Sequence, residues 1–192
     1  VLNALGSPVE AGFGLIDQGR TAVIEMAEAS GLAQLEATRL EPRVANTFGT
    51  GQLIRAATGK GVDKIILGIG GSATNDAGTG MALALGWKFR DESGEELASF
   101  PADLPKVREV IPPEGPPLPE IIVACDVVNP LLGPDGCTRT YGPQKGIEET
   151  DFAFYEAGLS HLVSLLGAED IARSPGAGAA GGLGFGGIVF LN

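Results

Sequence analysis

The sequence predicts an α/β fold, with helices packed on a mixed sheet, and two observations support this prediction. Short apolar runs of strand length alternate along the chain with segments of helical periodicity, as in α/β proteins. The first two runs, residues 10–16 and 21–27, flank Asp17-Gln18-Gly19-Arg20, a sequence typical of a hairpin. A hairpin pairs antiparallel, whereas strands joined through helices pair in parallel. We therefore expect both kinds of pairing in one sheet rather than a purely parallel sheet.

Beyond the hairpin, the apolar spacing and the glycines that follow it predict the remaining regular elements. The expected strands are residues 65–67, 87–90 and 120–125, the last of them buried because it contains the run Ile-Ile-Val-Ala-Cys. The expected helices are residues 29–35, 52–58, 81–85, 151–166 and 168–173.

The rest of the chain is expected to be irregular. The polar run up to Arg43 and residues 126–146 have the composition of loops. Residues 101–119 hold most of the prolines and should form an exposed connector with little regular structure. The segment from Ser174 to Asn192 is dominated by glycine and alanine and is expected to be a loop followed by a core run.

The composition indicates a single soluble domain over residues 1–192. Hydrophobic residues make up 44% of the chain and charged residues 19%, which suits an ordinary globular core. The net charge of −11 argues against a nucleic-acid or anionic-membrane surface, since either would need a basic face. Two cysteines do not make a disulfide framework, so we expect a cytoplasmic location. No stretch resembles a signal peptide or a membrane span, and the start at Val1 indicates a piece of a longer protein.

The stretch from Lys64 to Arg90 is the best candidate for a functional site. A strand ends in Gly68, Gly70 and Gly71, and four side chains with hydrogen-bonding oxygens follow within five positions: Ser72, Thr74, Asn75 and Asp76. A glycine-rich turn before a helix is typical of an anion site at a helix N-terminus. There Asp76 would orient a substrate hydroxyl or a water on Mg²⁺. The alternative is an ordinary turn in which Asn75 or Asp76 merely caps the helix.

Two glycine patterns raise a dinucleotide-binding alternative. Residues 68–73 nearly match GxGxxG after a strand, and residues 176–181 match it fully but follow Ser174-Pro175. The fingerprint works mechanically only between a strand and a helix, so the first match is the better one. The sequence contains no GxxxxGK[ST] phosphate loop.

Two further loops offer charged groups. Asp126 follows an expected strand directly, where a carboxylate is suited to hold Mg²⁺ or to accept a hydroxyl proton; the alternative is a turn that ends the strand. In the segment 141–146, Gln144 and Lys145 are suited to bind an oxyanion, and the alternative is a solvated loop lysine. The single histidine, His161, is expected to be packed on a helix, so any general base should be a carboxylate.

Four blocks of the sequence resemble the type I glycerate kinases: GIGGSATNDAGTGMALALG, CDVVNPLLGPDG, YGPQKG and PGAGAAGGLGFG, in the family's order. The resemblance runs from Val1 to Asn192 and includes LGSPVEAGFG and NTFGTGQLI. Family members are roughly twice as long, so it implies their inner domain, with a restriction-endonuclease-like α/β fold. The family's DSFKGS-like and TGEGR-like segments, which belong to a flavodoxin-like domain, are absent from this chain.

The resemblance implies transfer of the γ-phosphoryl group of ATP to D-glycerate, with Mg²⁺, to either the 2- or the 3-hydroxyl. Asp76, Asp126 and Lys145 are then the candidate catalytic residues, with Asp126 as the candidate metal ligand. The candidate substrate- and phosphate-binding residues are Gly70, Gly71, Ser72, Thr74, Asn75, Asn129, Gln144, Gly178, Gly181 and Gly182. One departure concerns Val128, where the family often has a second aspartate, and it bears on the metal role of Asp126.

Three functions remain open at this stage: part of a glycerate kinase, a dinucleotide-binding oxidoreductase domain, or a non-catalytic domain that packs on partners. In the first case the chain alone is expected to be inactive, because its loops form one wall of a cleft between domains. The expected partners are then glycerate, ATP and the flavodoxin-like domain, with a homodimer left open.

Overall fold

The computed structural model describes residues 1–36 and 38–191. Residue 37, in the loop expected before Arg43, and residue 192, the last of the expected domain, lie outside the described residues. The strands are β1 (Gly14–Ile16), β2 (Thr21–Glu25), β3 (Lys64–Gly68), β4 (Lys88–Arg90), β5 (Glu109–Ile111) and β6 (Glu120–Ala124). The α-helices are α1 (Ala27–Ser30), α2 (Phe48–Thr58), α3 (Thr79–Ala84), α4 (Cys137–Tyr141), α5 (Phe152–Leu166), α6 (Glu169–Arg173) and α7 (Ala179–Phe190). Short 3₁₀ turns are η1 (Asp17–Gly19), η2 (Leu32–Gln34), η3 (Leu104–Lys106), η4 (Pro143–Lys145) and η5 (Glu149–Asp151).

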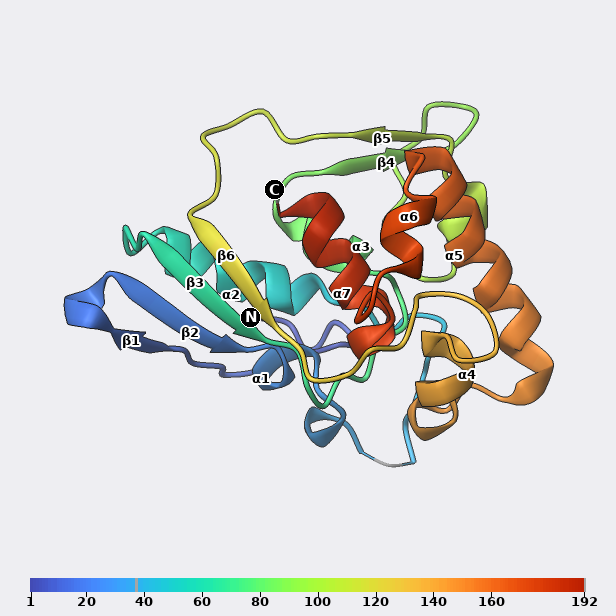
Figure 1. Ribbon diagram of the computed structural model, residues 1–192, viewed down its shortest axis with the longest axis horizontal. Coiled ribbons are helices and arrows are strands. Elements are labelled where there is room, and N and C mark those ends of the chain that lie inside the picture. Colours follow the sequence, from blue (N-terminus) through green and yellow to red (C-terminus); the bar gives the residue numbers. More distant parts are fainter. Residues whose placement is uncertain (37, 192) are drawn as a thin grey trace.

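The main sheet has the strand order β1-β2-β3-β6 and confirms the mixed pairing expected from the sequence. β1 runs antiparallel to β2, and the turn η1 joins them at the expected hairpin. β2, β3 and β6 are parallel and end in the same register, since Glu25, Gly68 and Ala124 are paired neighbours. In Figure 1 the sheet lies to the left, and α4 to α7 lie to its right.

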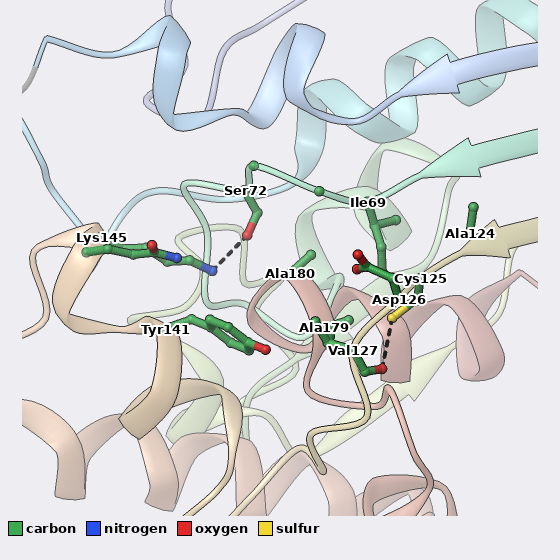
Figure 2. A pocket seen from close by; sticks show the side chains of 13 residues that line it. Ile69, Ser72, Ala124, Cys125, Asp126, Val127, Tyr141, Lys145, Ala179 and Ala180 are labelled. Carbon is green, nitrogen blue, oxygen red and sulfur yellow. Dashed lines mark hydrogen bonds between the residues drawn. The ribbon is translucent and has the colours of Figure 1, made fainter.

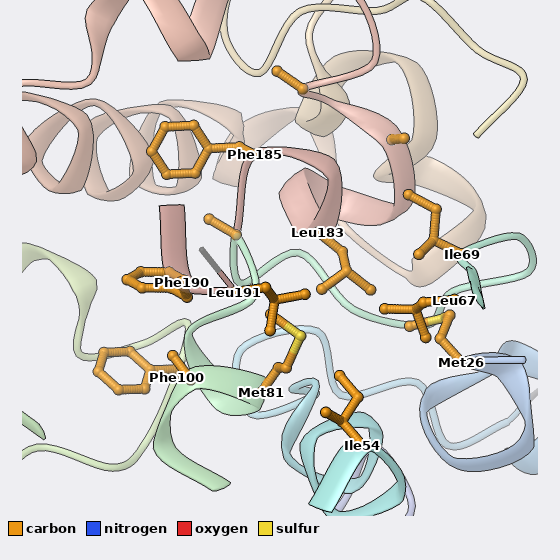
Figure 3. Packing of buried hydrophobic residues seen from close by; sticks show 14 of the residues in the cluster. Met26, Ile54, Leu67, Ile69, Met81, Phe100, Leu183, Phe185, Phe190 and Leu191 are labelled. Atoms are coloured by element: carbon orange, nitrogen blue, oxygen red, sulfur yellow. The ribbon is translucent and has the colours of Figure 1, made fainter. Parts of the chain in front are cut away.

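One face of this sheet is buried. Along β2 and β3 the side chains alternate, so that Ala22, Ile24, Ile65 and Leu67 are all fully buried while their neighbours Val23 and Ile66 are only half-buried. Leu53 and Ile54 of α2 belong to the same core. Figure 3 shows this interior, in which side chains of β3, α2, α3 and α7 converge.

Two expectations about strands were wrong. β6 is not a buried strand, because it is the edge strand of the sheet and Ile122 on its open face is 44% exposed. The proline-rich segment 101–119 is not merely an exposed connector. It contains β5, which pairs with β4, and its buried residues Leu104 and Val107 join the core. The aromatic rings of Phe89 and Phe100 pack edge-to-face at 5.0 Å beside it.

Two expectations about loops were also wrong. The segment 126–146 contains the helix α4 and the turn η4. The glycine-rich segment after Ser174 contains α7, which is largely buried and is interrupted near its start, because Ala180, Gly181 and Gly182 have left-handed φ; the regular helix follows from Leu183. Its glycines permit backbone contact, because a Cβ on Gly186 would overlap the backbone of Ala77, and one on Gly187 would approach Val123 of β6 to 2.9 Å. Helix propensity alone argues against such a helix, and close packing overrides it.

Candidate active site

A pocket lies at the carboxyl edge of the parallel strands. Because β2, β3 and β6 end in register, the loops that follow β3 and β6 leave the sheet side by side, which is where ligands bind in α/β sheets. The pocket has a volume of about 230 Å³. Its lining residues, shown in Figure 2, are Ile69, Gly70, Gly71, Ser72, Ala124, Cys125, Asp126, Val127, Tyr141, Gln144, Lys145, Ala179 and Ala180.

The loop that follows β3, residues 69–74, is called the glycine loop and forms one wall of the pocket. Gly71 has φ +73°, a left-handed conformation that favours glycine. The loop is anchored on both sides of Ser72, since Leu32 donates to the Gly71 carbonyl and the Ala73 N–H donates to Ser30, each at 2.9 Å. Among the described residues, the backbone N–H groups of Gly70, Gly71 and Ser72 have no acceptor. Consecutive free N–H groups of this kind suit an anion.

Lys145 enters the pocket from the turn η4. The residue is 2% exposed, and its ammonium donates to the Ser72 hydroxyl at 2.8 Å (Figure 2). It also donates to the Thr74 carbonyl at 2.6 Å. Burial lowers the pKa of Lys145 to about 8, although Cys137 and Asp76 oppose this shift. The lysine is therefore not the solvated loop lysine of the alternative interpretation.

The loop after β6 and the helix α4 form the opposite wall. Asp126 is exposed and lines the pocket, and the Cys125 thiol donates to the Val127 carbonyl at 3.3 Å. The Tyr141 hydroxyl donates to the Asn129 amide oxygen at 2.7 Å, which holds the tyrosine ring against the pocket. Burial, with added repulsion from Cys125 and Asp126, raises the pKa of Tyr141.

The N-terminus of α7 closes the pocket. Ala179 and Ala180 line it, and Ala180 has φ +53°, which is unusual for a residue other than glycine and marks a strained backbone. Gly181, at φ +67°, packs so closely on the glycine loop that a Cβ there would overlap the Thr74 carbonyl. α7 therefore presses directly against the segment that follows Ser72.

Asp76 lies beneath the pocket and not in it. Its side chain is fully buried and accepts hydrogen bonds from the Thr47 N–H and hydroxyl and from the N–H groups of Gly78 and Gly80. Burial raises the pKa of Asp76, while these hydrogen bonds lower it. The contacts match the capping alternative at the start of α3. The catalytic role expected for Asp76 stays a prediction, and no contact of its carboxylate with the pocket supports it.

The structure brings together only part of the expected site. Gly70, Gly71, Ser72, Asp126, Gln144 and Lys145 line one pocket, as expected of one binding site. Thr74, Asn75, Asn129, Gly178, Gly181 and Gly182 do not line it. Asn75 donates to the Thr138 hydroxyl at 3.0 Å, and the Thr74 hydroxyl and the Asn75 amide oxygen are buried without a partner among the described residues. Gly178 and Gly181 pack on backbone instead, and Gly182 packs on the Leu131 side chain and on Ala77.

Several lining residues were missed by sequence reasoning. They are Ile69, Ala124, Cys125, Val127, Tyr141, Ala179 and Ala180. Tyr141 had a usable signal, because it stands in the same short segment as Gln144 and Lys145. Ala179 and Ala180 stand between Gly178 and Gly181, two expected binding residues, but their apolar side chains gave no chemical reason to select them.

The pocket suits a magnesium ion only when a bound substrate supplies further oxygen atoms to the ion. No group of three or more His, Cys, Asp or Glu side chains that could hold a metal ion occurs among the described residues. Mg²⁺ commonly takes one or two carboxylates and completes its shell with water and substrate phosphates. Asp126, exposed at the pocket, fits that donor set.

The comparisons with known proteins decide the family. A model of the glycerate kinase family matches residues 1–192. The chain belongs to the glycerate kinase family. It is 43% identical to a glycerate kinase of Halalkalibacterium halodurans, over 98% of this chain and 51% of that protein. It is also 43% identical to glycerate 2-kinase of Escherichia coli, over 100% of this chain and 52% of that protein.

A solved structure agrees with this membership of the glycerate kinase family. A protein of Salmonella typhimurium LT2 assigned as glycerate kinase 2 matches with a TM-score of 0.93 and 40% identity, over 100% of this chain and 53% of that chain. The chain thus spans about half the length of the curated relatives it matches. The dinucleotide-binding alternative is not favoured, and its fingerprint lacks a helix at the required place because α3 begins only at Thr79. In the described part of the chain, no helix combines the length and apolar character needed to cross a bilayer.

Proposed function

We propose that this chain provides the glycerate- and phosphate-binding part of an ATP-dependent glycerate kinase, which transfers the γ-phosphoryl group to a hydroxyl of D-glycerate. The observation that carries the proposal is the buried ammonium of Lys145, which shares a pocket with the free N–H groups of Gly70, Gly71 and Ser72. Glycerate carboxylate and the transferred phosphoryl group are both anions. Positioning and charge neutralisation supply most of the catalysis in phosphoryl transfer, and this site offers both.

The size of the pocket supports a small acid rather than a whole nucleotide. At about 230 Å³ it is smaller than the ~300–1,000 Å³ typical of drug-sized ligands. Glycerate or a phosphate tail fits this volume, whereas the adenosine part of ATP needs more surface. The second half of the longer relatives would supply that surface in this proposal, as a flavodoxin-like domain of the same protein.

Each wall has a separate task in the proposal. The N–H groups of the glycine loop bind oxyanion oxygens, and Lys145 neutralises their charge. Asp126 would hold Mg²⁺ through one carboxylate, and the ion, when bound, neutralises charge on the phosphate oxygens. The free cysteines Cys125 and Cys137 support a cytoplasmic location as part of the same proposal.

A binding and turnover experiment tests this function. Calorimetry with the purified chain should detect D-glycerate or inorganic phosphate, and Lys145→Ala should weaken that binding by about 1.5–3 kcal/mol, the range for charged hydrogen bonds. Lys60→Ala, at an exposed lysine outside the pocket, is the matched control and should bind as the parent does.

The turnover arm uses Mg-ATP and D-glycerate with the chain alone and with the missing half added in trans. We expect product only in the second mixture, and its NMR spectrum identifies the phosphorylated hydroxyl. Absence of both glycerate binding and product formation would overturn the proposal. Turnover by the chain alone at ordinary kinase rates, ~1–100 per second, would show that the site needs no second half.

A further inference from the structure

Ser72 and Lys145 are in direct contact, and the binding of an anion does not by itself require this contact. The Ser72 hydroxyl lines the pocket and lies 2.8 Å from the Lys145 ammonium nitrogen, within reach for direct proton transfer. Seventy-three positions separate the two residues, so the fold brings them together and no local turn does so. A serine hydroxyl is a weak nucleophile until an adjacent base takes its proton, and a buried lysine is one of the groups that can do so.

The surroundings of Lys145 suit a base. Its burial lowers the pKa to about 8, so that about a tenth of the side chain is neutral near pH 7. The neutral amine can accept the Ser72 proton and still donate to the Thr74 carbonyl at 2.6 Å, which fixes its position. The titratable groups that face it are Cys137 and Asp76, with Asp126 and Tyr141 across the pocket.

The surroundings of Ser72 suit a nucleophile. Its backbone is fixed by the hydrogen bonds of Gly71 to Leu32 and of Ala73 to Ser30, so the hydroxyl has little freedom to leave the pocket. The free N–H groups of Gly70, Gly71 and Ser72 lie on the same loop and point to no described acceptor. Donors placed beside a nucleophile stabilise the oxyanion that forms when it attacks.

We propose that Ser72 is a nucleophile, with Lys145 as its base, and that it takes up a phosphoryl group from a phosphoric anhydride before that group passes to the acceptor hydroxyl. This inference rests on the proposed function, because ATP is the anhydride and glycerate the acceptor. In the first step the Ser72 oxygen bonds to the terminal phosphorus, the bond from phosphorus to the bridging oxygen breaks, and ADP leaves. The serine proton passes to Lys145, whose ammonium then lies against the phosphoserine dianion.

The second step reverses the roles. A hydroxyl oxygen of glycerate bonds to the phosphorus, the bond between phosphorus and the Ser72 oxygen breaks, and phosphoglycerate leaves. Lys145 gives its proton back to the Ser72 oxygen, and the proton of the glycerate hydroxyl is released to solvent, so that serine and the neutral lysine end the cycle as they began it. The route needs no group that the donor, the acceptor and this chain do not supply.

Acetyl phosphate tests the first step without a nucleotide site. It is a small mixed anhydride that fits the pocket, and peptide mapping by mass spectrometry locates its products on the purified chain. We expect phosphoserine at Ser72 and none in Ser72→Ala. The matched control is Ser93→Ala, at an exposed turn serine, which should be phosphorylated at Ser72 as the parent is. Lys145→Met should lower the rate of phosphorylation at Ser72 by at least ~10²-fold, the lower end of the range for a lost general base.

The parent chain also provides a test that needs no variant. The rate of Ser72 phosphorylation should rise as the pH increases through about 8, since the neutral amine is the base. Circular dichroism checks the fold of Lys145→Met. If that variant does not fold, the pH profile of the parent chain tests whether Lys145 is the base. Absence of phosphoserine at Ser72, acetylation of Lys145 as the sole product, or a flat pH profile would each overturn the inference.

The complete protein separates this inference from the proposed function. With Ser72 as the nucleophile, it should exchange label between ADP and ATP without glycerate, and Ser72→Ala should lose this exchange and turnover together. Glycerate phosphorylation that survives Ser72→Ala would overturn the serine route and leave the kinase function standing. Phosphoserine at Ser72 in a protein that never phosphorylates glycerate would support the serine route and overturn the kinase function.

Discussion

Thr47 satisfies the Asp76 carboxylate twice, through its backbone N–H at 2.9 Å and its hydroxyl at 2.8 Å from the same oxygen. The Thr47 hydroxyl in turn accepts from the Met81 N–H at 2.8 Å. Together these contacts join the start of α2 to the start of α3, directly below the glycine loop. They therefore predict a structural role for Asp76.

Asp76→Asn should lower the free energy of unfolding by about 3 kcal/mol, because an amide N–H₂ would replace an acceptor that faces buried donors. For a chain of this size the melting temperature should fall by roughly 6–12 °C. Asp170→Asn, at a fully exposed aspartate, is the control and should change stability by less than about 0.5 kcal/mol. Equal melting temperatures for Asp76→Asn and the parent, with turnover lost in the complete protein, would instead support the catalytic role.

Lys145 should make stability depend on pH in the alkaline range. The folded chain holds its proton less tightly than the unfolded chain, since burial lowers the pKa from 10.5 to about 8. The contribution of this group to stability is therefore fully present above pH 10.5 and is lost as the pH falls through about 8, by about 3 kcal/mol in all.

Urea denaturation of the parent and of Lys145→Met at about pH 7 and about pH 10 measures this effect. The parent should gain stability relative to the variant as the pH rises, and other titrating groups cancel in the difference. A constant difference over that range would contradict a lowered pKa of Lys145.

Gly181→Ala and Gly167→Ala form a matched pair that isolates the contact between α7 and the glycine loop. Both glycines have positive φ, +67° and +60°, so backbone strain from the new Cβ is similar. Only at Gly181 does that Cβ overlap a neighbour, the Thr74 carbonyl, whereas nothing lies within 4 Å at Gly167. Gly181→Ala should therefore cost at least about 2 kcal/mol more, as overpacking does. Equal losses in thermal denaturation would show that α7 can move away freely.

Tyr141 and Asn129 should be energetically coupled. Tyr141→Phe removes the donor to the Asn129 amide oxygen and should cost about 1 kcal/mol of stability. Asn129→Ala also frees the Asp135 carbonyl, which the amide N–H₂ contacts at 2.8 Å. Urea denaturation of both single variants and the double variant should give a coupling energy of at least ~0.5 kcal/mol. Strictly additive losses would mean that the hydrogen bond does not position Tyr141.

The elements that the sequence predicted well are those with strong local signals. The hairpin around η1 has a glycine turn between two apolar runs, and α5 has apolar residues at helical spacing with a glycine, Gly167, at its end. α7 was missed because its glycines, poor helix formers in isolation, are there for close packing on Ala77 and Val123. β6 was expected to be buried because an apolar run does not reveal whether a strand stands at the edge of a sheet.

In the candidate site, too, local sequence signals predicted some features, and only the tertiary fold revealed the others. Ser72 and Lys145 were both expected to be in it, since each stands in a glycine-flanked polar segment. Their direct contact follows from the tertiary fold and not from either segment. Asp76 was expected in the site because of its carboxylate, and Gly181 because of its glycine-rich segment. Asp76 lies beneath the pocket, however, and Gly181 packs on backbone. Residue type predicted membership of the region, and the tertiary fold decided which residues reach the pocket.

The central strand β3 has its two parallel partners, β2 and β6, on opposite sides of it in the sequence. Such non-local pairing is slow to form, because long connections must close before any contact is gained. Two residues of the pocket, Ala179 and Ala180, also stand in α7, near the end of the described chain. During synthesis the glycine loop therefore leaves the ribosome long before the helix that covers it. For that interval Leu67 and Met81, which pack with Leu183 in the finished core, stay open to chaperones and to other nascent chains.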